Sequence, residues 1–247
     1  MKRAQLLTAA VVLIAVWEIL ALVVNQPILP QPLVVFSVLA TELTGDLGWH
    51  FAASLWRVLA SMTLSIATAA PLGLILGQSE RLNRFFAPLV YLLYPVPKVV
   101  LVPIVLLFLG INDFSKIFMI FLILFFQILV LVRDQAAALR GELISSVRSL
   151  GAGRRALFRF VYLPASLPAV LTALRQSIGT AVAVLYIVEL VATRRGLGYY
   201  IYLQGSTLFD YPRMYAGVIA MSLLGFGLYV LADVLHQRLC PWQFVEK

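Results

Sequence analysis

Several charged residues occur inside long apolar stretches of this 247-residue chain, among them Lys98, Arg175 and Glu189. Lys98, Arg175 and Glu189 are costly to place in lipid, so residues of this kind indicate either function or pairing within the protein. We therefore take Pro97, Lys98, Arg175 and Glu189 as candidate functional residues, with internal pairing as the alternative for each charge.

Residues suited to catalysis are sparse. The chain holds one cysteine and two histidines, and Cys240, His50 and His236 fit no metal-ligand spacing. The sequence contains no G-x-x-x-x-G-K-[ST] run for nucleotide phosphates. It also shows no serine–histidine or paired-aspartate pattern typical of an intramembrane enzyme. We expect no catalytic, cofactor-binding or metal-binding residue in this chain.

A polar island, GELISSVRSLGAGRRALFRFVYLP at positions 141–164, separates two apolar stretches. Its first part predicts a short helix, which Gly151 ends because glycine readily takes the left-handed conformation. Positions 154–162 predict a second, arginine-rich helix along the inner membrane surface. We expect Pro164 and Pro168 to break the chain before the next span. A polar helix between glycines suits docking on a soluble partner, whereas the arginines also fit simple membrane anchoring.

The composition places these elements in a membrane. The chain is 62% hydrophobic and 12% charged, against roughly half and a quarter in soluble proteins. We predict an all-α membrane protein with one transmembrane domain over residues 1–247. Six stretches reach the length of about 20 apolar residues that a spanning helix needs. They are 6–24, 54–77, 85–109, 116–132, 168–192 and 214–235.

The distribution of Lys and Arg orients these spans. Most of the Lys and Arg residues lie in segments that are cytoplasmic if both termini are cytoplasmic. An excess of Lys and Arg in cytoplasmic loops is usual for membrane proteins. This bias also accounts for the net charge of +8 without nucleic acid. We interpret the first stretch as a retained helix, because no small-x-small cleavage site closes it. A surface helix is expected at positions 33–43, on the outer side.

The third stretch contains five helix-interrupting or charged residues within YPVPKVVLVP and its flanks. Prolines at 95, 97 and 103 must break the regular hydrogen-bond ladder there. Broken backbone at membrane depth is tolerated where it is buried in protein or lines a water-filled cavity. The segment is therefore either a kinked packing helix or a wall of a translocation path.

The run SSVRSLGAGRRALFRFVYLPASLP resembles the EAA loop of permease subunits of binding-protein-dependent ABC importers. Gly151, Leu163 and Pro164 match that pattern in place. Five further segments resemble the nitrate/sulfonate/taurine branch and occur in the right order: LPQP, SLWRVLAS, PLGLILG, YPVPKVVLVPIVLLFLGI and GLGYYI. The chain departs from the pattern where Ser145, Ser146 and Val147 replace Glu-Ala-Ala, and Glu142, one turn earlier, is the candidate substitute for the missing glutamate.

The resemblance implies a type I importer permease in a bacterial or archaeal cytoplasmic membrane, with partners in three places. A second permease subunit, expected to be identical, completes the membrane part. A cytoplasmic ATPase dimer binds ATP and Mg, so this chain binds no cofactor. An extracytoplasmic binding protein delivers the solute, and Gly196, Leu197, Gly198 and Tyr199 are its candidate contacts. The resemblance also implies a translocation path, for which Pro97, Lys98, Arg175 and Glu189 are the candidates. A cation that faces this path would suit an anionic solute such as a sulfonate, nitrate or bicarbonate. The expected ATPase-coupling residues are Glu142, Ser145, Ser146, Val147, Arg148, Leu150, Gly151 and Ala152.

Two alternatives stand beside this interpretation. The importer could carry a non-anionic solute such as a vitamin precursor. Six spans with proline breaks and buried charges also fit a secondary transporter or channel. That class has no evident need for a polar cytoplasmic helix ended by glycine, which favours the importer.

Overall fold

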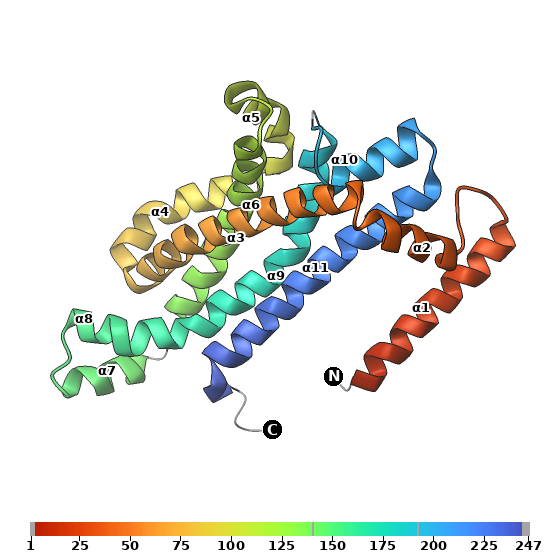
Figure 1. The fold of residues 1–247 in the computed structure, drawn as a ribbon. Coiled ribbons are helices and arrows are strands. Elements are labelled where there is room, and N and C mark those ends of the chain that lie inside the picture. The colour runs from red at the N-terminus through yellow and green to blue at the C-terminus, as the bar shows by residue number, and fades with distance from the viewer. Residues whose placement is uncertain (1–2, 140, 192, 244–247) are drawn as a thin grey trace. The chain divides into compact units, whose positions relative to one another are not determined.

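The computed structural model describes residues 3–139, 141–191 and 193–243, and these residues form helices without strands. Figure 1 shows the helices along the chain. The longer elements are α1 (Arg3–Val24), α2 (Pro32–Glu42), α3 (Asp46–Gln78), α4 (Glu80–Leu93), α5 (Val102–Leu109), α6 (Asp113–Ala137), α7 (Gly141–Ser149), α9 (Leu163–Leu190) and α11 (Tyr211–Leu239). The shorter ones are η1 (Lys98–Leu101), α8 (Arg154–Leu157), η2 (Phe158–Tyr162), α10 (Leu197–Tyr202), η3 (Leu203–Thr207) and η4 (Pro241–Gln243).

Helices lie at all six positions where the sequence predicts a span. Four are long and apolar enough to cross a membrane by themselves: α3, α6, α11 and the helix Arg155–Leu190 that contains α9. A bent pair, Glu80–Leu93 with Lys98–Leu109, meets the same test jointly and turns by 74° at its break. The apolar part of α1, Thr8–Val24, is shorter. The break in the third segment confirms what its prolines predict.

The chain divides into two compact units. Unit 1 consists of residues 1–55 and 189–224, and unit 2 consists of residues 56–188 and 225–247. Each unit is therefore assembled from segments far apart in the sequence.

In unit 2, α3 and α6 pack along a seam of small residues. Ser61 Oγ lies 3.1 Å from the carbonyl oxygen of Ile117, and Ser65 Oγ lies 3.4 Å from that of Phe121. Further along, a Cβ added to Gly73 would lie only 2.9 Å from the carbonyl oxygen of Leu129. Each of these pairs is separated by the same 56 positions. A constant offset means that the two helices run parallel, and small residues at every fourth position let their backbones approach closely.

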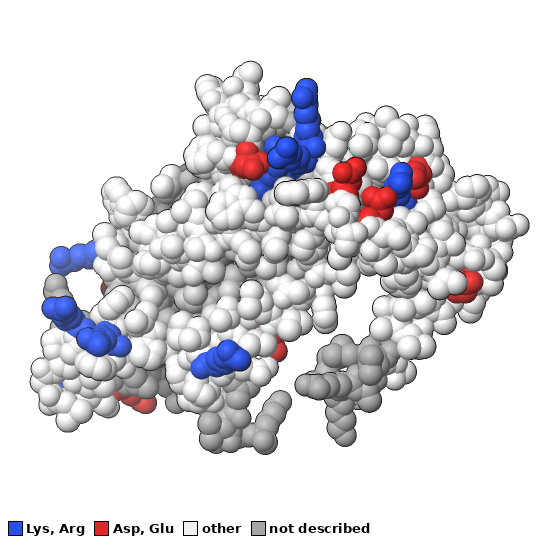
Figure 2. All heavy atoms as spheres, viewed as in Figure 1, with Lys and Arg blue, Asp and Glu red and all other residues white. Residues whose placement is uncertain are grey.

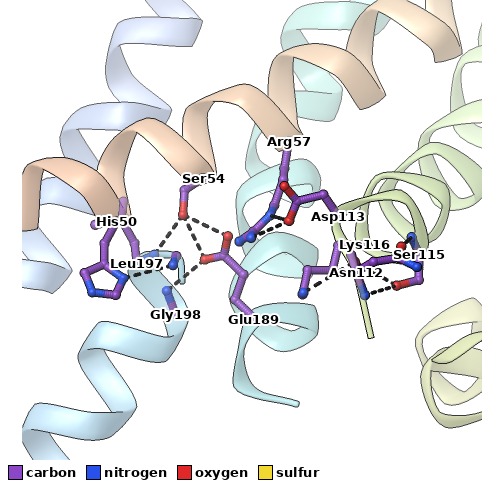
Figure 3. A network of polar contacts seen from close by, with 11 residues as sticks. His50, Ser54, Arg57, Asn112, Asp113, Ser115, Lys116, Glu189, Leu197 and Gly198 are labelled. Carbon is purple, nitrogen blue, oxygen red and sulfur yellow. Dashed lines mark hydrogen bonds and ion pairs between the residues drawn. The ribbon is translucent and has the colours of Figure 1, made fainter. Parts of the chain in front are cut away.

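The start of α6 is fixed by charge and by a cap. Arg57 donates to Asp113 Oδ1, with Nη2 at 2.6 Å and Nε at 2.9 Å. Asn112 caps the helix, because its Oδ1 accepts the N–H of Ser115 at 3.0 Å while the Ser115 hydroxyl lies 3.4 Å from the Asn112 nitrogen. This reciprocal pair satisfies two N–H groups that the helix leaves open. Figure 3 shows both contacts.

The expected break at Pro164 and Pro168 does not occur. The helical path continues from Arg155 to Leu190, and Pro168 lies inside α9. A wide π-helical turn, Phe158–Tyr162, directly precedes the first of these prolines. Its last bond runs from the Leu163 N–H to the Phe158 carbonyl, five residues back. Such a turn widens the helix locally, which gives the Pro164 ring room without ending the helix.

In unit 1, α2 confirms that positions 33–43 are largely helical. Its Phe36 packs edge-on against Trp17 of α1, with ring centroids 6.3 Å apart, and Trp17 also stacks on Tyr215 at 5.8 Å. Arg213 forms an ion pair with Glu42 at 3.0 Å. Aromatic and ionic contacts thus connect three segments of this unit.

Candidate functional site

The turn at residues 193–196 and the first turn of α10 are held by a buried carboxylate of unit 1. Glu189 has no exposed surface. The Ser54 hydroxyl lies 2.8 and 2.9 Å from its two oxygens, and the N–H of Gly198 donates to one of them at 2.9 Å. Ser54 in turn accepts the N–H of Leu197 at 2.8 Å. A buried carboxylate is stable only when such donors surround it, so Glu189 and Ser54 clamp the turn (Figure 3).

A histidine holds the same turn from its other side. His50 Nδ1 accepts the N–H of Gly196 at 3.0 Å. Its ring lies 5.8 Å from that of Tyr199 and 5.3 Å from that of Tyr200. Because Nδ1 accepts this bond, a neutral His50 carries its proton on Nε2. The sequence offers no metal-ligand pattern for His50, and the structure gives it a positioning role.

Gly196 is required where it stands. Its φ is +130°, and an added Cβ would overlap the Glu189 carboxylate. A side chain is therefore excluded both by backbone conformation and by space. Of the candidate binding-protein contacts, Gly196, Leu197 and Gly198 are buried and Tyr199 is partly exposed. The accessible side chains at this turn are those of Arg194 and Arg195.

In unit 2, the Lys98 amine binds backbone carbonyls where α4 ends. Its Nζ donates to the carbonyl oxygens of Leu93, Tyr94 and Val96 at 2.9, 3.1 and 3.3 Å. It also lies 4.5 Å from the centroid of the Phe126 ring. The helical hydrogen-bond ladder ends at the proline-rich break, where Leu93 still accepts the Val96 N–H at 3.3 Å, and the amine adds a donor to all three carbonyls.

A cavity of about 280 Å³ adjoins this amine within unit 2. It is lined by the break that follows α4 and by η1, α6 and α9, and its residues include Lys98, Pro97, Gln127 and Thr180. The candidate path residues Pro97 and Lys98 therefore share one cavity. Their role in translocation stays a prediction.

Arg175 lies elsewhere in unit 2 and is paired. Its Nη1 is 3.2 Å from Asp233 Oδ1, and its guanidinium lies 5.9 Å from the Tyr229 ring centroid. Asp233 also accepts from Gln237 at 2.9 Å. For Arg175 and Glu189 the structure thus shows the internal pairing that the sequence left as the alternative.

The polar island forms a short helix, a glycine turn and a second helix. α7 ends at Ser149, and Gly151 follows with a φ of +83°, as predicted. Leu150 at the tip is 84% exposed. Glu142, Ser145, Ser146 and Arg148 are exposed as well, so this end of unit 2 presents an accessible surface. Figure 2 shows Lys and Arg side chains gathered in this region.

Two features of these sites escaped prediction from the sequence. The first is the clamp, because Ser54 and His50 are far from Glu189 along the chain. The second is the small-residue seam on α3, formed by Ser61, Ser65, Ala69, Gly73 and Gly77. Its spacing of four is a recognisable signal in an apolar helix. The clamp has no comparable local signal.

Among the described residues, no group of three or more His, Cys, Asp or Glu side chains is placed to hold a metal ion.

A family model described as "binding-protein-dependent transport system inner membrane component" matches residues 69–241. The chain belongs to this family.

Individual relatives extend the similarity to nearly the whole chain. The taurine transport system permease protein TauC of Escherichia coli (strain K12) is 31% identical over 243 residues, covering 95% of this chain and 88% of TauC. The formylaminopyrimidine transport permease protein ThiX of Halalkalibacterium halodurans is 31% identical over 234 residues, covering 94% and 92%. A solved structure of the inward-facing MetNI methionine ABC transporter gives a TM-score of 0.70 at 18% identity, covering 80% of this chain and 97% of that one.

These findings establish the class of protein. The chain is a multi-pass membrane permease of an ABC importer, with the type I permease fold. It is a non-catalytic subunit, and ATP hydrolysis belongs to a separate subunit. The family excludes the secondary transporter or channel considered from the sequence.

Proposed function

We propose that this permease imports a small anionic solute of the sulfonate or taurine class, delivered by an extracytoplasmic binding protein. The observation that carries the proposal is the 31% identity to a taurine permease across 95% of this chain. A nitrate or bicarbonate importer belongs to the same anionic class. The bacterial or archaeal cytoplasmic membrane is the expected location, with lipid around the spans.

The α7–Gly151 element is the proposed coupling point. Its exposed polar helix and apolar tip residue, Leu150, suit a groove on a cytoplasmic ATPase. Glu142 is exposed in the first turn of α7 and takes the place of the missing motif glutamate. ATP and Mg bind the ATPase dimer, and closure of that dimer moves α7. Two copies of this permease form the membrane part.

A second candidate solute is a vitamin precursor. ThiX, named for formylaminopyrimidine transport, matches this chain at the same 31% identity as TauC. Its similarity is a specific reason to test a neutral or cationic heterocycle beside a sulfonate.

The test is transport by the complete importer. The permease, its ATPase and its binding protein are reconstituted in proteoliposomes, and uptake of labelled taurine is compared with uptake of a formylaminopyrimidine. We expect saturable taurine uptake that requires both ATP and the binding protein. Uptake of the pyrimidine alone would assign the chain to vitamin-precursor import.

Glu142→Ala tests the coupling point in the same preparation. It should weaken co-purification of the ATPase, whereas Glu80→Ala, at an exposed glutamate of α4, should not. Equal ATPase recovery with both variants would contradict the substitution of Glu142 for the motif glutamate.

A further inference from the structure

A cavity of about 540 Å³ lies between the first turns of α3 and the turn that follows α9, within unit 1. It is lined by Asp46, Trp49, His50, Ala52, Ala53, Arg194 and Arg195. Its volume falls within the range of small-molecule sites, about 300–1,000 Å³. Two guanidinium groups against one carboxylate give the lining a net positive charge.

The cation at position 194 is available for a ligand. Arg194 is exposed, and among the described residues no hydrogen bond or ion pair engages its guanidinium. Trp49 is 78% exposed and lines the same cavity. The indole therefore adds an aromatic surface to the charged lining.

The arginines stand on a rigid support. The backbone directly after them is fixed by His50 at Gly196, by Ser54 at Leu197 and by Glu189 at Gly198. Figure 3 shows these side chains converging on the turn. A site whose donors are already positioned loses less entropy on binding. The clamp thus serves as a positioning device for the cavity.

We propose that this cavity binds a small oxyanion, a sulfonate or carboxylate, through Arg194 and Arg195. Guanidinium groups bind such anions with paired hydrogen bonds. Asp46 and Trp49 provide a carboxylate and an aromatic face for an ammonium group, so the site prefers a zwitterion such as an aminosulfonate over a simple anion. The preference for an aminosulfonate rests on the proposed function, and the cavity is the permease's own receiving site for the solute.

The concave shape favours a small ligand over a docked protein. The lining combines a few charged groups with Ala52 and Ala53 and encloses a ligand-sized volume. Contact with the binding protein is the competing explanation for exposed arginines, and a lipid phosphate is a second source of the same oxyanion chemistry. The experiment separates these occupants.

The test is calorimetric titration of the full permease–ATPase complex in phosphatidylcholine nanodiscs, without nucleotide or binding protein. The probes are taurine, ethanesulfonate and ethanolamine. We expect saturable binding of taurine, weaker binding of ethanesulfonate and none of ethanolamine. Arg194→Gln should lower taurine affinity about tenfold, since a charge-assisted hydrogen bond contributes about that factor.

Matched variants control for charge and for folding. Arg81→Gln removes an exposed arginine of α4, which does not line the cavity, and should leave taurine binding unchanged. Arg194→Lys keeps the charge but loses the planar fork and should give an intermediate affinity. Thermal unfolding of each complex shows that the fold is retained.

Three results would overturn the proposal: no saturable taurine binding by the wild type, equal affinity of Arg194→Gln and Arg81→Gln, or loss of only binding-protein association in Arg194→Gln. Adding phosphatidylglycerol should leave the taurine affinity unchanged. Loss of taurine binding after this addition would assign the cavity to a lipid headgroup. Transport failure with intact taurine binding contradicts only the proposed function. Transport without binding by the nanodisc complex contradicts only the receiving site.

Discussion

At the residue scale, two buried charges stabilise irregular backbone. Glu189 accepts the N–H of Gly198 in the first turn of α10, and Lys98 donates to three carbonyls at and just after the end of α4. Backbone polar groups lose their partners where a helix ends, and in a membrane protein water does not readily replace them. A charged side chain can replace the lost partner with a strong hydrogen bond. The sequence marks both residues as unusual, but only the structure supplies their partners.

Replacing Lys98 tests this role. Lys98→Met should destabilise the protein by roughly 2 kcal/mol, because charge-assisted hydrogen bonds are lost and carbonyls stay unpaired. Thermal unfolding in detergent measures the loss, with Arg81→Met as the exposed control. If Lys98→Met unfolds like the wild type yet transports poorly, the amine acts on the solute path instead.

Tyr200 gives a prediction for alkaline pH. It is buried, and its hydroxyl has no hydrogen-bond partner among the described residues. Burial, and then the nearby Glu42 carboxylate, raises the pKa of Tyr200 to about 12 from its ordinary 10.0. The folded protein therefore keeps the phenol neutral at a pH where the unfolded chain ionises it. The stability tied to this group is complete below about pH 10 and is lost as the pH rises towards 12.

Tyr200→Phe should thus match the wild type at neutral pH and lose less stability between pH 10 and 12. Unfolding curves at several alkaline pH values measure the difference, and Tyr202→Phe, at a half-exposed tyrosine, is the control. Parallel curves for the wild type and Tyr200→Phe would show that the burial of this phenol does not govern alkaline stability.

At the element scale, the close packing of α3 and α6 in unit 2 depends on small residues in α3. α3 and α6 keep one register from Ser61 to Gly73, with an offset of 56 positions. Because carbonyl oxygens of α6 occupy the space beside the small residues, a larger side chain must push the helices apart. The α7–Gly151 element shows the opposite case. The space around Gly151 is open, and the constraint on this residue is its positive φ.

Gly73→Leu should destabilise the protein by about 1–3 kcal/mol, the usual cost of overpacking. Gly179→Leu is the matched control, because no atom lies within 4 Å of its added Cβ. Thermal unfolding in detergent compares the two. Equal stability of both variants would mean that the seam tolerates separation of α3 and α6.

Gly151→Val should reduce transport several-fold while ATP hydrolysis continues, because a β-branched residue resists a φ of +83°. Gly153→Val provides the control, since Gly153 has open space and no such φ. Both activities are measured in proteoliposomes. Normal transport by Gly151→Val would show that the turn after α7 is not needed for coupling.

Sequence patterns predicted elements better than sites. The six apolar stretches, the break at Pro95 and Pro97 and the glycine stop at Gly151 follow from local chemistry, and the structure confirms each as a helix, a bend or a turn. The predicted helix break at Pro164 and Pro168 was wrong, because the helix runs on from Arg155 to Leu190 after a π-helical turn at Phe158–Tyr162. The clamp that Ser54 and Glu189 form was not predicted, since it joins residues 135 positions apart.

At the scale of the whole molecule, orientation in the membrane follows from the distribution of Lys and Arg. That distribution predicts α7 on the cytoplasmic side and the segment before α11 on the outer side. Leu150 and Leu208 are 84% and 57% exposed, and they mark these two segments. Cys240 is the chain's one cysteine and is buried, which makes thiol labelling a direct measure of orientation.

Leu150→Cys and Leu208→Cys, each in a Cys240→Ser background, should label from opposite sides. In right-side-out vesicles an impermeant maleimide should modify Leu208→Cys only, and lysis should expose Leu150→Cys. The reverse pattern would place the termini outside and would remove α7 from contact with any cytoplasmic ATPase.

The sequence by itself determined the class, the helical spans and the glycine-ended polar helix, because hydropathy, proline and glycine act through local backbone physics. Only the tertiary structure decided which charges are paired. Arg175 meets Asp233, and Glu189 meets Ser54 and Gly198, across separations that no local pattern encodes. Burial makes the pairing of Glu189 necessary, since a charge removed from water requires a partner. The same packing left Arg194 exposed at a cavity, which is where we place the receiving site for the solute.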